Sequence, residues 1–339
     1  MNTILRHFLI TALLACQFPS FVVAQSRSTG NFVMERPKGL PNIKMKTLGG
    51  KQFWTDVLHF HSWRIQVNSL TKHYRLLDRD NNRHASGNYA HCHRELDGIK
   101  RELELPAMHG KAVVLLHGLG NARSKMEPLA KLLRENGYQV FNVTYASTRS
   151  RLEQHASALR HLLENLNGIE EINFVCFSLG NVVVRHYLHD ITDSRTGQLL
   201  DRRMQRMVML GPPNNGAQLA NRFSGNDLFE LVYGASASQL GSDWEEAQKR
   251  LATPSFEFGI IAGCGNGVIP QNPLIQGVDD FVVGVEETRL AGAADFLVVE
   301  TSHTTMVNNQ LVQQATLSFL KNGHFTSVDR RQPISDAAR

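Results

Sequence analysis

The most constraining feature of the chain is an apolar strand pattern that runs into a Ser-x-Gly turn and then into an apolar helix pattern. Residues 174–184 read Phe-Val-Cys-Phe-Ser-Leu-Gly-Asn-Val-Val-Val. A serine oxygen is a weak nucleophile unless a base takes its proton, and it must stand clear of the backbone to meet a carbonyl carbon. A sharp strand-to-helix turn holds a serine in that position. The stretch therefore predicts Ser178 as a nucleophile; an ordinary helix N-cap is the alternative, since helix starts favour serine.

Further motifs surround this turn. Cys176 stands where the G-x-S-x-G pattern has its first glycine, and cysteine is small enough to be a tolerated variant. Upstream, an apolar run over residues 111–116 leads into His-Gly-Leu-Gly at residues 117–120. Together the motifs resemble those of α/β-hydrolases, bacterial lipases and esterases above all. The resemblance implies an oxyanion hole made by the backbone amides of Leu119 and Leu179.

The resemblance extends over residues 106–322 and sets the expected fold. Residues 126–149 resemble the helix and strand that follow the His-Gly turn, and residues 207–217 resemble a strand and turn of triacylglycerol lipases. The expected fold class is α/β, namely an α/β-hydrolase fold. It has a mostly parallel central sheet, helices on both faces and a small helical cap insert.

The catalytic base is expected downstream, because the order in this fold is serine, acid, histidine. His303 follows the apolar strand pattern of residues 296–299, where the family has its histidine loop. The rival His324 lies in a polar stretch after the terminal helix. His117 is expected to brace the oxyanion turn and is left out of the triad.

The acid is predicted to be Asp280, which is in register with the family's acid turn. Asp279 is the second choice and Asp295 a distant third. The acid would hold the imidazole tautomer and stabilise the imidazolium. A loop aspartate that caps a turn is the alternative interpretation of Asp280.

These residues predict cleavage of carboxylic esters through an acyl-enzyme, without a cofactor. Acyl transfer and thioester or amide hydrolysis are alternatives, because the same triad supports them and fold analogy does not separate them. A non-catalytic binding protein with a hydrolase fold is the alternative from another class. Specificity is expected in the predicted cap, residues 214–255, which is partly amphipathic. The cap could equally well pack onto the sheet.

The N-terminus has the pattern of an export signal. A basic start precedes an apolar stretch, and small or branched residues lead to Gln25, so residues 1–24 are predicted to be a signal peptide. The protein is then exported, to the periplasm or the medium. A lipoprotein box that ends in Cys16 is the minority alternative.

The rest of the chain is expected to be one α/β domain with an extension, because 339 residues with 42% hydrophobic residues can bury a large single core. Residues 63–67 and 73–77 predict an antiparallel hairpin, which could open the sheet, and residues 89–105 a charged helix. The predicted organisation is a linker at 25–42, an extension at 43–105, a hydrolase domain at 106–325 and a flexible tail at 326–339.

The formal net charge of +5 comes from basic residues that are scattered among acids. It therefore favours a solvated surface over nucleic-acid binding. The expected partner is a small-molecule or lipid ester substrate, with peripheral membrane contact as an option and the oligomeric state open.

The cysteines and the paired histidines could in principle form disulfides or bind metal ions. Without the signal three cysteines remain, too few for a disulfide framework; a Cys92–Cys264 bridge stays open, and Cys176 is expected to be buried. Two His-x-His pairs, at residues 59–61 and 91–93, look superficially like metal ligands. Residues 91–93 fall in a predicted helix, where positions two apart point in different directions. Surface or packing histidines are the better interpretation of both pairs, so no metal site is predicted.

Overall fold

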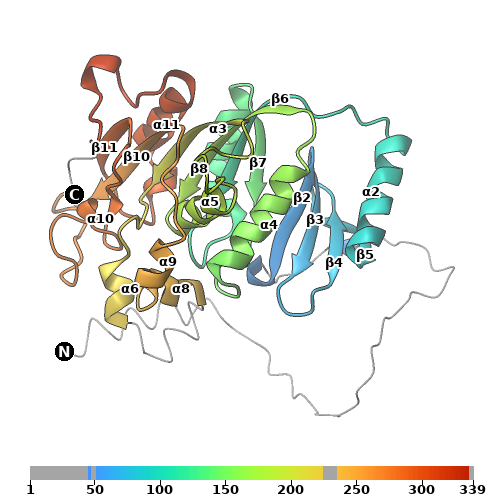
Figure 1. Cartoon of the computed structure of the whole chain (residues 1–339), viewed down its shortest axis with the longest axis horizontal. Helices are drawn as coiled ribbons and strands as arrows, with labels where there is room; N and C mark the ends of the chain where they lie inside the picture. Colours follow the sequence, from blue (N-terminus) through green and yellow to red (C-terminus); the bar gives the residue numbers. More distant parts are fainter. Residues whose placement is uncertain (1–44, 47–50, 224–234, 336–339) are drawn as a thin grey trace, which may run out of the picture. The chain divides into compact units, whose positions relative to one another are not determined.

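The computed structural model describes residues 45–46, 51–223 and 235–335. The predicted signal peptide, the predicted linker up to residue 42 and the middle of the predicted cap lie outside these residues. The described residues form two sheets with helices around them (Figure 1).

A six-stranded sheet carries the candidate site, and its strand order is β11-β10-β9-β8-β6-β7. Every neighbouring pair in it is parallel. The strands are apolar along most of their length because both faces are covered, as parallel sheets require. Their bounds are β6 (Gly110–Leu116), β7 (Gln139–Val143), β8 (Ile169–Phe177), β9 (Met204–Leu210), β10 (Glu257–Cys264) and β11 (Asp295–Glu300).

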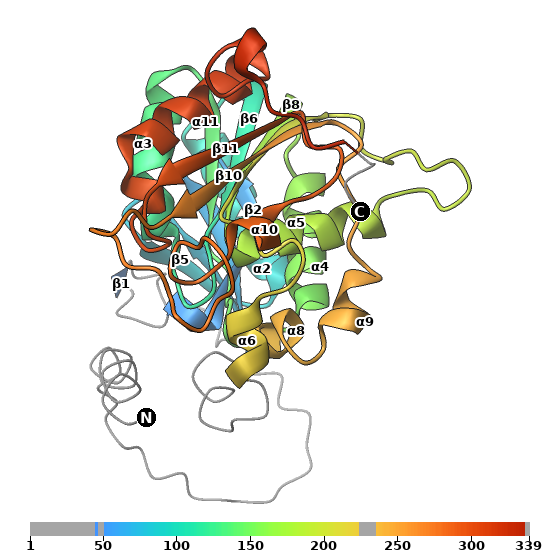
Figure 2. The same cartoon turned by 90° about the vertical axis from the view of Figure 1, so that its left-hand side faces the viewer.

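Helices cover both faces of this sheet, as Figure 2 shows. Alternate strand residues belong to two different cores: Val114 packs with α4 (Leu152–Glu164) and α5 (Leu179–Asp190), whereas Val113 packs with α3 (Glu127–Glu135) and α11 (Gln310–Asn322). This alternation follows from the two-residue period of a strand. The short helices of the same part of the chain include η2 (Arg123–Met126), α10 (Val285–Thr288), η3 (Met306–Asn308) and η4 (Val328–Arg330).

The N-terminal extension forms a second, antiparallel sheet of order β1-β5-β4-β3-β2. The predicted hairpin is present as β3 and β4, with Val67 opposite Tyr74, but it belongs to this sheet and not to the central one. Cys92 and Leu96 of α2 pack on the apolar side of the sheet. The bounds are β1 (Met45–Lys46), η1 (Lys51–Phe53), β2 (Trp54–Phe60), β3 (Trp63–Asn68), β4 (Tyr74–Leu77), β5 (Asn82–Gly87) and α2 (Tyr89–Glu102).

The two sheets are joined where β2 passes the end of β7. The backbone N–H of Asp56 donates to the carbonyl of Thr144 at 2.8 Å, and the Thr144 N–H donates to Oδ2 of Asp56 at 2.6 Å. One step on, the Ala146 N–H donates to Oγ1 of Thr55 at 3.1 Å. Residues 144–146, which follow β7, are therefore held by the N-terminal extension.

The C-terminal segment departs from the expected flexible tail. Ile334 is buried, and its N–H donates to the carbonyl of Ala293 at 2.9 Å. The Gln332 N–H donates to Oδ1 of Asp295 at 2.9 Å. A single apolar side chain and a buried carboxylate therefore hold residues up to Ser335 in place, a long-range arrangement that a polar composition does not reveal.

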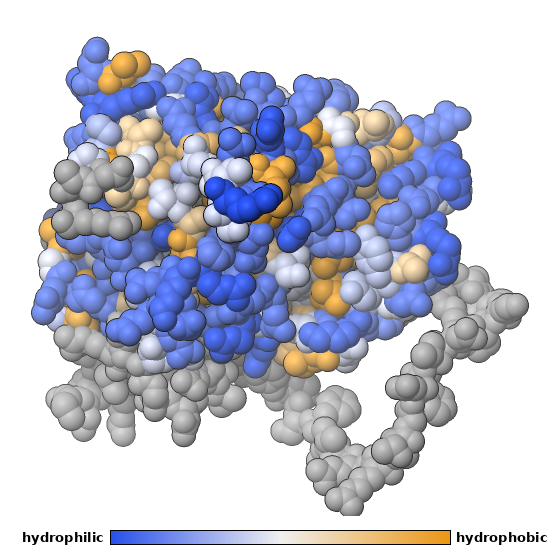
Figure 3. Space-filling view, viewed as in Figure 1, coloured by the Kyte–Doolittle hydropathy of each residue, from blue (hydrophilic) through white to orange (hydrophobic). Residues whose placement is uncertain are grey.

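The surface agrees with the mixed charge of the sequence. On the face drawn in Figure 3, hydrophilic residues predominate and hydrophobic ones occur in smaller areas between them. None of the helices in the described ranges combines the length and the apolar character needed to span a membrane.

Candidate active site

Ser178 occupies the turn between β8 and α5, at the carboxyl end of the central sheet. Its backbone has φ 53° and ψ −121°, a conformation that residues other than glycine rarely adopt. Its N–H donates to the carbonyl of Leu210 at 2.9 Å. Strain of this kind concentrates at functional positions, where the surroundings hold it in place.

Three small residues near Ser178, namely Gly118, Cys176 and Gly180, allow a close approach of the surrounding backbone. A Cβ on Gly180 would lie 2.7 Å from the carbonyl oxygen of Leu116, so only glycine lets α5 come this near to β6. A Cβ on Gly118 would lie 3.1 Å from Cβ of Ser178, which puts the His-Gly turn directly against the serine. Cys176 is fully buried in the core beneath α5, as the sequence predicts.

The predicted oxyanion donors, the amides of Leu119 and Leu179, each follow one of the two residues in contact, Gly118 and Ser178. Residues 118–121 form a turn in which the Asn121 N–H donates to the carbonyl of Gly118 at 3.2 Å, and Gly120 has φ +68°. Leu119 lies inside the turn, and Leu179 is the first residue of α5. Neither amide has a hydrogen-bond acceptor within the part of the chain that the structure describes, so both are available to a bound oxygen.

His117 braces this turn. Its Nδ1 donates to the carbonyl of Gly118 at 2.9 Å, which leaves Nε2 as the acceptor for the Tyr145 N–H at 3.5 Å. Its ring stacks on Tyr145, with centroids 4.3 Å apart. Burial lowers the pKa of His117 to about 4, so the ring is neutral near pH 7.

Asp280 and His303 meet at the same end of the sheet. Nδ1 of His303 lies 2.7 Å from Oδ2 of Asp280, while Oδ1 of Asp280 accepts the N–H groups of Val282 and Val283 at 3.0 and 2.8 Å. The carboxylate is therefore fixed on both oxygens. Because Nδ1 donates to the acid, Nε2 keeps its lone pair and can accept a proton.

The histidine ring lies beside the serine turn. Its centroid is 4.7 Å from that of Phe177, the residue before Ser178. A Cβ on Gly211 would lie 3.1 Å from Cε1 of His303, and Gly211 follows the residue whose carbonyl accepts the Ser178 N–H. The structure thus brings the predicted serine, histidine and acid to one place.

The other acid candidates lie in structural positions. Asp279 is fully buried, and its Oδ1 accepts the N–H groups of Asn272 and Phe281 at 2.9 and 2.7 Å. Asp295 begins β11, at the opposite end of the sheet, and accepts N–H groups of the C-terminal segment. The carboxylate that contacts the His303 ring is that of Asp280.

The described part of the predicted cap contains α6 (Gln218–Phe223), α8 (Ala235–Leu240) and α9 (Trp244–Gln248). One buried guanidinium holds both ends of this insert. Arg185 of α5 donates from Nε to the carbonyl of Ala252 at 3.0 Å, and from Nη1 to the carbonyl and Oδ1 of Asn214 at 3.2 and 3.0 Å. In the sequence, this role of Arg185 is indicated only by the presence of one arginine within the apolar pattern of α5.

The cysteines and paired histidines serve packing and local contacts. Cys92, Cys176 and Cys264 are free thiols, so the bridge left open by the sequence is not formed. The His61 ring contacts the carbonyl of Pro106 at 2.8 Å, and His93 pairs with Asp97 at 3.0 Å. Among the described residues, no group of histidine, cysteine and acidic side chains could hold a metal ion.

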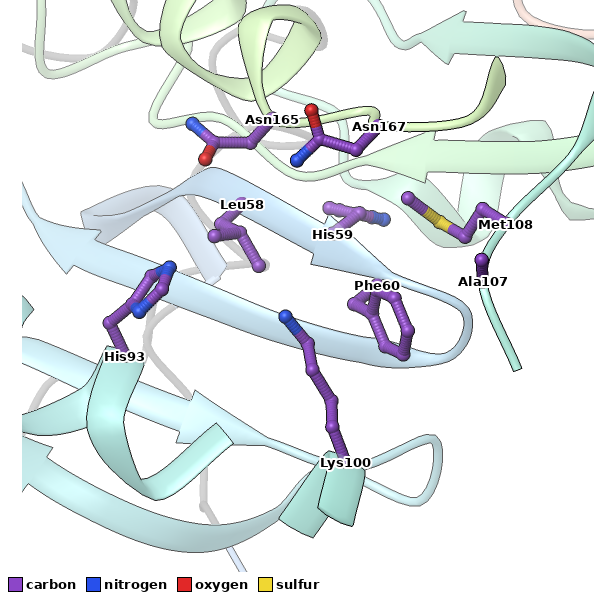
Figure 4. Close-up of a pocket in the computed structure, with 9 residues that line it drawn as sticks. All are labelled: Leu58, His59, Phe60, His93, Lys100, Ala107, Met108, Asn165 and Asn167. Carbon is purple, nitrogen blue, oxygen red and sulfur yellow. The ribbon is translucent and has the colours of Figure 1, made fainter. Parts of the chain in front are cut away.

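A cavity of about 220 Å³ lies between the N-terminal extension and the central domain (Figure 4). It is at the amino ends of β6 and β8, because Met108 precedes one strand and Asn167 the other. Ser178 is at the opposite ends of these strands, so the cavity is separate from the candidate active site. Its lining residues are Leu58, His59, Phe60, His93, Lys100, Ala107, Met108, Asn165 and Asn167.

No model of a known protein family matches the sequence, and comparison with curated proteins finds no match. Three similar solved structures are the product of the gene lin2722 from Listeria innocua, the mature form of lipase BlEst2 from Bacillus licheniformis, and the metagenomic carboxyl esterase MGS0156. The Listeria protein is 17% identical to this chain and matches 63% of it over 94% of its own length. The Bacillus lipase is 16% identical and matches 64% of this chain over 94% of its own length, and the metagenomic esterase is 17% identical and matches 58% over 65%. Each of the three has a TM-score of 0.44.

The fold itself follows from the topology. The parallel strand order, the helices on both faces and the strained serine turn at the end of β8 are the features that the resemblance predicts. The chain has the α/β-hydrolase fold.

Proposed function

We propose that this protein is a serine hydrolase that cleaves carboxylic esters through an acyl-enzyme. Ser178 is the nucleophile, His303 the general base and acid, and Asp280 the residue that orients the imidazole. The backbone amides of Leu119 and Leu179 are the oxyanion donors. No cofactor takes part in this scheme.

In the proposed reaction, Oγ of Ser178 attacks the ester carbonyl carbon while Nε2 of His303 takes the hydroxyl proton. The carbonyl oxygen becomes an oxyanion and accepts hydrogen bonds from the two amides. Collapse of this intermediate expels the alcohol, which receives the proton from His303, and leaves an acylated serine. A water molecule activated by the same histidine then releases the carboxylic acid and restores Ser178.

One observation carries the proposal: the His303 ring, held by Asp280 at 2.7 Å, lies against the strained turn that bears Ser178. An N-cap serine needs neither the positive φ nor the histidine and acid beside it. The amides of Leu119 and Leu179, which have no acceptor among the described residues, add a place for a negatively charged oxygen.

The test is hydrolysis of p-nitrophenyl esters from acetate to palmitate by the purified protein, with Ser178→Ala as the control. Turnover that disappears in Ser178→Ala is the expected result, and the preferred chain length would separate an esterase from a lipase. Absence of turnover on every ester would refute the assignment. Parallel assays with thioesters, amides and acceptor alcohols would then decide among the alternative acyl-transfer reactions and a binding protein.

The cap defined by residues 214–255 is the proposed determinant of the acyl group, because it follows β9 and precedes β10, at the end of the sheet that carries Ser178. The substrate class is a small-molecule or lipid ester. Replacement of the cap should change chain-length preference without abolishing labelling of Ser178 by a fluorophosphonate.

We also propose export, on the sequence of residues 1–24 alone. Expression of the full chain in a bacterium, followed by fractionation and N-terminal sequencing, tests it. A mature N-terminus near Gln25 in the periplasm or medium is expected. Membrane-bound protein with a lipid on Cys16 would instead support the lipoprotein alternative. An uncleaved cytoplasmic chain would contradict both the signal peptide and the lipoprotein.

A further inference from the structure

A closed ring of hydrogen bonds connects the N-terminal extension to the proposed oxyanion turn. The Gly120 N–H donates to Oγ of Ser147 at 3.0 Å, and the Ser147 hydroxyl donates to Oε1 of Gln52 at 3.2 Å. Nε2 of Gln52 donates to the carbonyl of Asn121 at 2.5 Å and closes the ring. Gln52 thus uses both its acceptor and its donor on residues that touch or belong to the turn.

The partners of this ring are themselves fixed. Ser147 is fully buried, and its N–H donates to the carbonyl of Tyr145 at 2.9 Å. Thr148 donates from Oγ1 to the same Gln52 oxygen at 3.3 Å. Gln52 lies in η1, immediately before β2, whose residues Thr55 and Asp56 bind the segment that leads to Ser147. The extension therefore contacts the segment 144–147 through Gln52, Thr55 and Asp56.

The turn needs such support because of Gly120. Glycine has access to more backbone conformations than any other residue, and here it adopts φ +68°. The Asn121 N–H is bonded to the carbonyl of Gly118 across the turn, so a rotation at Gly120 has to be taken up by the rest of the turn, which includes the Leu119 amide. The ring holds the turn on both sides of that rotation, at the Gly120 N–H and at the Asn121 carbonyl.

We infer that Gln52 is a positioning residue of the oxyanion hole: it aims the Leu119 amide from outside the catalytic domain. This inference rests on the proposed function. Preorganised donors accelerate a reaction because their geometry needs no rearrangement as charge develops. Loss of Gln52 should therefore lower kcat and leave KM nearly unchanged, since the turn stabilises the transition state more than the substrate.

The experiment compares Gln52→Met, which keeps the volume but removes both polar atoms, with Gln205→Met as a matched control. Gln205 is an exposed residue of β9. For each variant, kcat and KM on the best p-nitrophenyl ester, the rate of Ser178 labelling by a fluorophosphonate, thermal unfolding and hydrogen exchange of peptides that span residues 117–126 are measured. Gln52→Glu and Ser147→Ala complete the set.

We expect Gln52→Met to lower kcat and the labelling rate about tenfold, a fraction of the 10²–10³ lost with a whole oxyanion donor, and to speed exchange at residues 117–126. Gln205→Met should match the wild type. Gln52→Glu keeps the acceptor for Ser147 and should lie between them. Combination of Gln52→Met with Ser147→Ala should cost no more than the worse single change, because both break one ring.

Different results separate the two proposals. If Gln52→Met and Gln205→Met have the same kcat and the same exchange, Gln52 is not a positioning residue, whatever the reaction. If kcat falls only in proportion to the fraction of unfolded protein, its role is structural and the inference is wrong. If the wild type neither turns over esters nor reacts with the fluorophosphonate at Ser178, the proposed function fails and the inference fails with it, although faster exchange would still show that Gln52 holds the turn.

Discussion

Asp280 and His303 are connected twice. The backbone N–H of His303 donates to the carbonyl of Asp280 at 2.8 Å, and the ring Nδ1 bonds to the carboxylate at 2.7 Å. The loop of the acid and the loop of the histidine are thus fixed to each other before the side chains meet. A change to the carboxylate alone should leave the loop geometry in place.

Asp280→Asn is the variant that uses this arrangement. The backbone bond keeps His303 in position, but an amide no longer stabilises the Nδ1–H tautomer or the imidazolium. We expect kcat on p-nitrophenyl esters to fall about 10³- to 10⁴-fold, with unchanged circular dichroism. Activity within tenfold of the wild type would remove Asp280 from the triad.

Asp279→Asn should have the opposite pattern. The carboxylate bonded to the His303 ring is that of Asp280, whereas Oδ1 of Asp279 accepts two backbone N–H groups of the acid loop. We expect a lower free energy of unfolding in urea, by about 1–2 kcal/mol, and nearly normal kcat per folded molecule. A selective loss of kcat here, with Asp280→Asn active, would exchange the two assignments.

The two glycines Gly180 and Gly98 form a matched pair for stability. A methyl group on Gly180 would collide with the Leu116 carbonyl, whereas around Gly98, within α2, nothing lies within 4 Å of a new Cβ. Gly180→Ala should destabilise the fold by about 1–3 kcal/mol, and Gly98→Ala should stabilise it by about 0.5–1 kcal/mol. Urea unfolding of both variants measures this, and equal effects would show that the close approach of α5 to β6 is not as described.

Arg185 predicts the cost of releasing the cap. Among the described residues, its hydrogen-bond partners include no carboxylate, and burial lowers its pKa to about 10, so it is still charged near pH 7. Arg185→Met leaves its acceptors in Asn214 and Ala252 unpaired and should lower the free energy of unfolding by about 3 kcal/mol. Arg185→Lys should not restore it, since one ammonium lacks the planar fork that reaches both segments. Wild-type stability in Arg185→Lys would show that charge alone suffices.

Acid should destabilise the protein through two buried histidines. Burial lowers the pKa of His117 to about 4 and that of His155 to about 3, from an ordinary 6.5. Below pH 6.5 the unfolded chain binds a proton on each that the folded chain does not, so the free energy of unfolding falls as the pH falls. Each histidine contributes about 1.4 kcal/mol per pH unit down to its folded pKa.

Urea unfolding between pH 7 and pH 5 measures this slope. His155→Gln should make it shallower by one proton, and His109→Gln, which removes an exposed histidine, controls for the substitution itself. An unchanged slope in His155→Gln would contradict the neutral buried state of His155.

The features of the site that short sequence patterns determine were predicted from the sequence. A serine between a strand and a helix, and a histidine after the last strand, can each be recognised within about ten residues of sequence. The structure brings that histidine beside Asp280 and beside the turn that carries the serine. The support of Gln52 could not be predicted, because its partner Asn121 lies 69 residues away and the contact exists only after two sheets have joined. The hairpin was predicted, but its sheet was not: pairing between strands is a tertiary choice that alternation alone leaves undetermined.

The backbone pairing of Asp56 with Thr144 has a consequence for solubility. β7 is the last strand of the central sheet, and an open edge of that kind is a template on which another chain can add a strand and begin to aggregate. Asp56 of β2 bonds to Thr144 at the end of β7 and places its carboxylate there, so the extension covers this end of the edge strand. Removal of residues 43–105 would expose it, so a trimmed catalytic domain would be expected to aggregate even where its core is intact.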